Sequence, residues 1–159
     1  MGSFATAVQS CLRERLATLR PRFDWRTEHR IAGTPVDIAG HATDHTALVE
    51  LEWRRADPAD NTAKLFRHLS EGALAADRID VFQVFTGYYD LAGGGVSSKR
   101  RNAEFVGRVA ADALDALSYH AIEFVLNPPK RGAERPDGWR AVADTTANRI
   151  AVRLSDASV

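Results

Sequence analysis

Apolar and polar residues recur along this chain with two different periods. In residues 4–19 the apolar side chains return every three or four positions, with arginine and glutamate between them, which predicts an amphipathic helix that Pro21 ends. Residues 27–53 change to short β-like runs, separated by a turn at 32–34 and by the polar stretch 40–45. We interpret the runs 27–31, 35–38 and 47–53 as three strands of an antiparallel meander.

The second half of the chain alternates helices with strands. Asp57 and Pro58 form a helix-start signal, a capping acid followed by proline at the first helical position, and we expect this helix to reach about residue 75. Residues 79–86 are too continuously apolar for a solvent-facing edge, which predicts a strand inside the sheet. A helix over 99–117 and a strand over 119–126 follow. Residues 139–154 favour a last helix, with a strand near the end as the alternative.

This order of elements, α-β-β-β-α-β-α-β-α, predicts an α/β fold. We expect a mixed sheet, an antiparallel meander plus parallel crossover strands, flanked by helices in a three-layer arrangement. The chain has 159 residues, 45% of them hydrophobic, which fits a single domain over residues 1–159. It lacks an apolar run of about 18 residues or a leader pattern, so we expect a cytoplasmic protein that does not enter membranes.

Charge is balanced over the whole chain and concentrated locally. The 21 basic and 21 acidic residues give a formal net charge of zero, so any polyanion must be bound by a local patch. Two clusters could grip phosphates: Lys99, Arg100 and Arg101 before one helix, for which we expect DNA binding, and Lys130, Arg131 and Arg135 near the end of the chain. A solvated basic face is the alternative for both.

Three acids carry the candidate chemistry. Glu50 and Glu52 are two apart on a predicted strand, so their carboxylates leave the same face with backbones about 6 to 7 Å apart. Asp37, on the preceding strand, can lie opposite them in a hairpin. Such crowding is costly without a cation, and Mg²⁺ prefers oxygen ligands and activates water for phosphodiester attack. The alternative is a solvent-facing strand that carries alternating acids.

These residues resemble the PD-(D/E)XK (restriction endonuclease-like) nuclease superfamily. The similarity lies in Asp37, twelve intervening residues, and then Glu50-Leu51-Glu52, followed by a helix and a buried strand, and it covers roughly residues 4–126. It implies a restriction endonuclease-like fold and a metal site for Mg²⁺, with Mn²⁺ as a possible substitute, built from Asp37, Glu50, the Leu51 carbonyl and Glu52. Glu52 stands where the family usually has lysine; some members keep activity with Glu or Gln there.

The helix that follows could complete such a site. By resemblance, Asn61 and Lys64 in its first turns join the acids as catalytic residues, with Lys64 replacing the missing lysine and Glu52 binding metal or activating water. Lys64 as a solvated helix residue is the alternative. Glu14 and Glu28 could add a further acid. His41, Asp44 and His45 could bind a transition metal, although a polar hairpin loop is the simpler interpretation.

The resulting hypothesis is a metal-dependent endonuclease that hydrolyses phosphodiester bonds in DNA, of restriction or repair type. One site cannot cut both strands of a duplex, so we expect a homodimer. Two alternatives remain open at the level of sequence. One is a catalytically inactive restriction-endonuclease-like binding module, and the other is a hydrolase of small phosphorylated substrates.

Overall fold

Five strands form one mixed sheet in residues 2–155, which the computed structural model describes. Their order in the sheet is β1-β2-β3-β4-β5, and β1–β2 and β2–β3 are antiparallel whereas β3–β4 and β4–β5 are parallel. The predicted meander with parallel crossover strands is therefore confirmed, and β4 lies inside the sheet as expected. The strands are β1 (Asp24–Ile31), β2 (Thr34–His41), β3 (His45–Glu52), β4 (Arg78–Thr86) and β5 (Leu117–Phe124).

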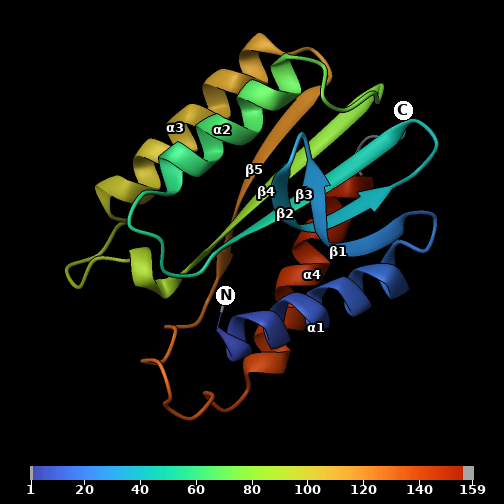
Figure 1. The fold of residues 1–159 in the computed structure, drawn as a ribbon. Coiled ribbons are helices and arrows are strands. Elements are labelled where there is room, and N and C mark those ends of the chain that lie inside the picture. The colour runs from blue at the N-terminus through green and yellow to red at the C-terminus, as the bar shows by residue number, and fades with distance from the viewer. Residues whose placement is uncertain (1, 156–159) are drawn as a thin grey trace.

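Four helices cover the two faces of this sheet and give three layers (Figure 1). The first and last helices pack together on one face, α1 (Ser3–Leu19) and α4 (Trp139–Ser155). The other pair packs on the opposite face, α2 (Pro58–Ser70) and α3 (Ser98–Ala113). Each pair of helices packs against the strands and encloses a separate hydrophobic core. Among residues 2–155, no helix combines the length and the apolar character needed to span a bilayer.

Several predicted boundaries were wrong by a few residues. The polar stretch 40–45 is not one loop, because Gly40 and His41 end β2 and His45 begins β3. Gly40 belongs to the strand because the Trp25 ring of β1 lies where a side chain would stand, 2.7 Å from an ideal Cβ. The helix expected to reach residue 75 ends at Ser70, and the last predicted strand ends at Phe124 rather than at residue 126.

Local signals explain why α2 begins where it does. The Asp57 carboxylate accepts a hydrogen bond from the backbone N–H of Asp60, and Pro58 occupies the first turn, where no N–H partner is needed. The apolar positions of α2 then return every three or four residues and pack on the sheet; they are Leu65, Phe66 and Leu69. This anchoring places the first turn of α2 beside the end of β3.

The carboxyl ends of β3, β4 and β5 meet at one edge of the molecule. Figure 1 shows the N-terminus of α1, the 3₁₀ turn η1 (Gly87–Tyr89) and the loop between β5 and α4 at this same end. Ligands of open α/β sheets bind preferentially at the carboxyl ends of the strands. Glu50 and Glu52 lie in the last three residues of β3 and so reach this edge.

Candidate active site

Asp37 and Glu50 face each other across the β2–β3 pair. The Asp37 Oδ2 atom accepts a 2.7 Å hydrogen bond from the backbone N–H of Leu51, and the Asp37 N–H donates to Glu50 Oε2 at 3.4 Å. Both side chains are buried. Leu51 belongs to the opposite core, as strand alternation predicts. The hairpin therefore brings the first two predicted acids together.

A strained residue on β1 adjoins this pair. Glu28 has a φ of 53°, in the left-handed region that a non-glycine residue adopts at a cost of about 1–2 kcal/mol. The buried amide of Gln9 on α1 donates to Glu28 Oε1 at 2.9 Å and to the Asp37 carbonyl at 2.6 Å. Gln9 thus links α1 to Glu28 and to the backbone of Asp37. The only sign of Gln9 in the sequence was that a polar residue stands on the apolar face of the predicted helix.

Glu52 lies on the same face as Glu50, under the first turns of α2. Its exposed fraction is 1%, and its Oε1 atom accepts a 2.8 Å hydrogen bond from the Gln83 amide of β4. The same amide nitrogen donates to Thr62 Oγ1 at 2.7 Å. Asn61 lines the same small cavity as Glu52, and its side chain lowers the Glu52 pKa against the effect of burial. Asn61, predicted from the resemblance, is therefore in contact with the acids.

Gln83 is itself held in place by Tyr119 of β5, whose hydroxyl donates to Gln83 Oε1 at 2.7 Å. The Tyr119 ring passes over Gly107 of α3, where an ideal Cβ would stand 2.4 Å from a ring carbon. Gly107 is thus required for close helix–sheet packing at this point. Sequence reasoning missed Gln83, although a polar residue between the apolar pairs 81–82 and 84–85 was a usable signal.

Burial raises the pKa values of all three acids. For Glu50, burial comes first and the neighbouring charges of Asp37 and Glu52 add to it, so its pKa stands well above the ordinary value. Burial also raises the pKa of Asp37 against the opposing Leu51 hydrogen bond, and that of Glu52 against the opposing Gln83 hydrogen bond. Glu50 Oε1 and Glu52 Oε2 are buried without a hydrogen-bond partner. Unpartnered carboxylate oxygens of this kind need a proton or a cation.

Arg55 is the cation nearest to these acids. Its Nε atom lies 3.5 Å from Glu52 Oε2, and its charge lowers the pKa values of all three acids against the effect of burial. Its backbone N–H donates to the Tyr89 hydroxyl at 2.9 Å, which fixes the chain as it leaves β3. Sequence reasoning did not select Arg55. The only sign of it in the sequence was its position three residues after Glu52.

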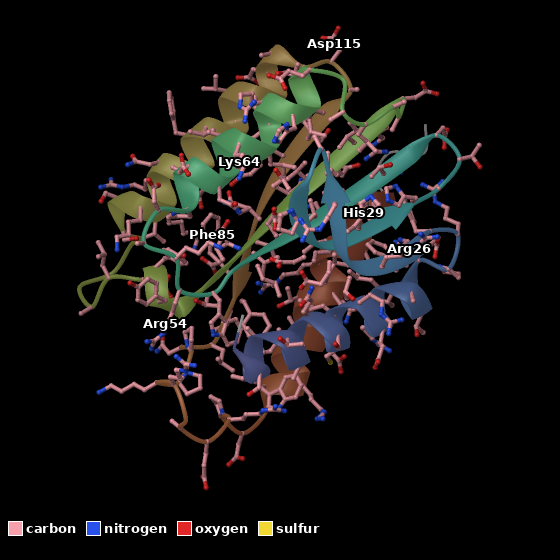
Figure 2. The ribbon with its side chains drawn as sticks, in the orientation of Figure 1. Arg26, His29, Arg54, Lys64, Phe85 and Asp115 are labelled. Carbon is pink, nitrogen blue, oxygen red and sulfur yellow. The ribbon has the colours of Figure 1, made fainter. Side chains whose placement is uncertain are left out.

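Lys64 lies elsewhere. It is exposed on α2, and the helix residues that line the small cavity at the acids are Asn61, Thr62, Leu65 and Phe66 (Figure 2). Asn61 thus lies at the cavity beside the acids, whereas Lys64 does not line it. The cation next to Glu52 is Arg55, in the role that the sequence prediction gave to Lys64. A catalytic role for Lys64 stays a prediction.

The basic cluster in the first turn of α3 is divided in the same way. Lys99 and Arg101 are exposed, whereas Arg100 is buried and its Nε atom pairs with Glu104 at 2.7 Å. Arg100 also lies within 4 Å of Asp90 and Glu123. Its charge is therefore compensated by acids within the chain. DNA binding by this cluster stays a prediction, with Lys99 and Arg101 as its accessible members.

The donor set suits a hard cation in its chemistry, because carboxylate oxygens are the ligands that Mg²⁺ prefers and two of them have no hydrogen bond. The cavity between Glu50, Glu52 and α2 measures only about 10 Å³, about the space of a single water molecule. Within residues 2–155, no group of three His, Cys, Asp or Glu side chains is already arranged to hold a metal ion.

A second buried polar cluster lies at the opposite end of β3 and β4, on the α1/α4 face. Asp80, fully buried, contacts His45 Nε2 and His120 Nε2 at 2.7 Å each and Arg78 Nε at 2.9 Å. Burial would raise the pKa of Asp80, but the hydrogen bonds from His120 and His45 outweigh it and lower that pKa. Both ring nitrogens of His45 are engaged, Nε2 by Asp80 and Nδ1 by Arg22 at 3.0 Å, which removes His45 from the transition-metal alternative with His41 and Asp44.

The candidate site therefore consists of three buried acids at the carboxyl end of β3, a hydrogen-bonded chain from Tyr119 through Gln83, and one arginine. Such a group can hold a cation or a proton, and it can accept a proton from water near neutral pH. Comparison of the sequence with models of protein families and with curated proteins finds no match.

Proposed function

We propose that this chain is a Mg²⁺-dependent endonuclease with a restriction endonuclease-like fold that hydrolyses phosphodiester bonds in DNA. The observation that carries the proposal is the burial of Glu50 and Glu52 beside Asp37 at the end of one strand. Glu50 Oε1 and Glu52 Oε2 have no hydrogen-bond partner there, and the only cation paired with either in residues 2–155 is Arg55, 3.5 Å from Glu52 Oε2. A protein retains such crowded, partly unsatisfied carboxylates at a cost in stability, and perturbed carboxylates of this kind gather at functional sites.

Each acid has a distinct task in this proposal. Asp37 and Glu50 would hold the metal together with the Leu51 carbonyl, while the Leu51 N–H keeps Asp37 oriented. A cation held there would lower the pKa of a water molecule and offset charge on the phosphate. Glu52, oriented by Gln83, accepts a proton from the attacking water, because burial raises its pKa above the ordinary value of a glutamate and makes it a stronger base.

Arg55 and Asn61 complete the arrangement around Glu52. The guanidinium of Arg55 can offset the negative charge that develops as water bonds to phosphorus and the bond to the leaving sugar oxygen breaks. Asn61 keeps Glu52 in place from the first turn of α2. Lys64 remains the alternative cation that the resemblance implies, and a homodimer remains the expected form for cleavage of both strands.

A catalytically inactive binding module is the second candidate. The observation in its favour is the closed cavity of about 10 Å³ at Glu50 and Glu52, which admits no phosphate group without movement of α2. In that case the three carboxyls would share protons instead of a cation. The two candidates differ in whether a divalent cation binds.

Two measurements separate these possibilities. Plasmid nicking with Mg²⁺ and Mn²⁺ is compared for the wild type, Asp37→Asn and Glu50→Gln; we expect nicked circles only from the wild type. Thermal unfolding with and without Mg²⁺ gives a readout that needs no activity, and a metal-dependent rise in Tm should disappear in both variants. Nicking that survives both substitutions would place the site elsewhere. Absence of both effects would favour the binding module, and activity on small phosphoesters alone would favour the small-substrate hydrolase.

A further inference from the structure

A basic hollow of about 800 Å³ lies where β3 leaves the sheet, between the first turn of α1 and the loop that follows β5. Its volume falls within the roughly 300–1,000 Å³ of sites that hold small molecules or a short stretch of polymer. Aromatic side chains contribute to its lining, Phe4 of α1 and Trp53 after β3, with their rings edge to face at 5.2 Å. Four cations also line it, Arg54, Lys130, Arg131 and Arg135, and the remaining lining residues are small or uncharged.

The charge of this hollow is uncompensated. No carboxylate lines it, and within residues 2–155 none of the four cations lies within 4.0 Å of an acid. Arg54 donates to the Pro128 carbonyl and lies over the Tyr88 ring, and Arg135 lies over the Phe4 ring. These contacts hold the guanidinium groups in place and leave their charge available. Arg100 in the first turn of α3, by contrast, is already paired with Glu104.

The hollow adjoins the three acids through the chain itself. Arg54 is two residues beyond Glu52, so their Cα atoms are at most about 7 Å apart. Successive nucleotides of a strand rise by about 3.4 Å, so a few nucleotides would span this distance. Strand alternation turns Trp53 to the α1/α4 face and Glu52 to the α2/α3 face. A ligand that reaches both sites must therefore pass around the carboxyl end of the sheet, where Figure 1 shows η1 and the loop between β5 and α4.

We propose that this basic hollow binds the phosphodiester backbone of a single nucleic-acid strand, with a base against Trp53, and so holds the strand whose scissile phosphate reaches the acids. This inference rests on the proposed function and names the form of its substrate. Guanidinium and ammonium groups around an aromatic lining are the elements with which proteins hold single strands. The concave shape suits a flexible strand better than the flat surface of a membrane, and the aromatic lining exceeds what a free phosphate ion would use.

The test measures binding without cleavage. Fluorescence anisotropy of a labelled single-stranded oligonucleotide is followed in EDTA over a salt series for the wild type and for Lys130→Gln/Arg131→Gln/Arg135→Gln. Loss of three phosphate contacts should reduce the slope of log K against log salt by about 2, at about 0.7 per contact on a single strand, and should weaken binding at least about tenfold at low salt. Arg131→Lys/Arg135→Lys, which keeps the charge, should retain most of the slope.

A matched control removes the same charge from a distant surface. Arg26, Arg30 and Arg67 are exposed, and Figure 2 places Arg26 at the opposite side of the molecule from Arg54. The triple Gln variant of these residues should bind as the wild type does. Equal weakening by both triple variants would overturn the proposal, as would binding to phosphatidylserine vesicles or to inorganic phosphate without binding to the oligonucleotide.

The outcome is independent of the metal. Asp37→Asn should bind the oligonucleotide with unchanged affinity in EDTA even though its nicking is lost. Binding that depends on the hollow in a protein without nuclease activity would refute the proposed function and leave the hollow as a strand-binding site. Nicking activity with normal binding by the Lys130/Arg131/Arg135 variant would refute the hollow alone.

Discussion

The Asp37 carboxylate accepts a 2.7 Å hydrogen bond from the backbone N–H of Leu51, which ties β2 to β3 at the point where the three acids meet. Asp37 therefore has one carboxylate oxygen engaged in the sheet. Its charge and its hydrogen bond can be removed separately by substitution, which distinguishes chemistry from folding.

We predict that Asp37→Asn keeps the fold and loses metal binding, because the Asn carbonyl still accepts from Leu51. Its Tm without metal should stay near that of the wild type. Asp37→Ala should cost about 1–3 kcal/mol, since the buried Leu51 N–H is left without a partner. Urea unfolding and Mg²⁺ calorimetry of the two variants check this. Equal destabilisation by Asn and Ala would contradict it.

Stability should fall with rising pH because of Glu50. Burial and the charges of Asp37 and Glu52 raise its folded-state pKa, so between the unfolded and folded pKa values the folded protein holds more protons than the unfolded chain. The stabilisation from proton binding is full below the unfolded value of 4.5 and is lost as pH rises through the folded value. Glu50→Gln should thus be more stable than the wild type by about 1–3 kcal/mol above the folded pKa. Denaturant unfolding at about pH 5 and about pH 8 measures the difference, which should grow with pH.

Arg55 and Lys64 should differ in effect. Arg55→Gln removes the charge 3.5 Å from Glu52 and should slow Mg²⁺-dependent nicking by at least about tenfold, roughly the 1.4 kcal/mol of a modest transition-state contact. Lys64→Gln, on the exposed side of α2, should change the rate by less than about twofold if Arg55 has the catalytic charge. The reverse ranking in a nicking time course would return that role to Lys64.

The chain from Tyr119 to Gln83 should contribute measurably to stability. Tyr119→Phe leaves Gln83 Oε1 without the donor that fixes the amide, so we expect a loss of about 1 kcal/mol and a lower nicking rate from a misoriented Glu52. Tyr88→Phe, at a tyrosine that is 41% exposed, is the matched control and should unfold as the wild type does. Equal unfolding curves for both variants would sink this prediction.

Asp80 should be among the costliest acids to replace. Asp80→Asn removes the charge that faces His45, His120 and Arg78 in the interior, and breaking a buried ion pair costs about 3–5 kcal/mol. Asp115→Asn, at an exposed acid at the far end of α3 in Figure 2, should change stability by less than about 0.5 kcal/mol. Because hydrogen bonds lower the pKa of Asp80, its contribution should be lost as pH falls through the folded value. Unfolding of both variants by urea checks the ranking.

The architecture could be predicted because each element carries its own periodic signal. The capping pair at Asp57 and Pro58 located the start of α2, and the apolar run 79–86 indicated an interior strand. The end of β2 could not be predicted from the local sequence, because glycine is typical of loops. In the structure the Trp25 ring fills the space that a side chain at Gly40 would need. Pairing across strands decided that boundary.

Only the part of the site that follows from strand alternation and the hairpin could be predicted from the sequence. Alternation and the hairpin place Asp37, Glu50 and Glu52 together from sequence. Gln83 and Tyr119 come from neighbouring strands and Gln9 from α1, so their contacts with the site depend on sheet order and helix docking. The partner charge was assigned to Lys64 by resemblance, supported by its helical spacing from Asn61, whereas Arg55 lies 3.5 Å from Glu52 through a turn with no periodic signature.

The segment from Glu52 to Arg55 contributes to two sites. Glu52 and Arg55 belong to the group of acids, and the two residues between them, Trp53 and Arg54, line the basic hollow. A one-residue insertion or deletion at the end of β3 would turn each side chain to the other face and disrupt both surfaces together. The length of this segment should therefore vary far less among related chains than the long loop between β5 and α4, and a graft of the acids onto another sheet would have to carry residues 50–55 as one unit.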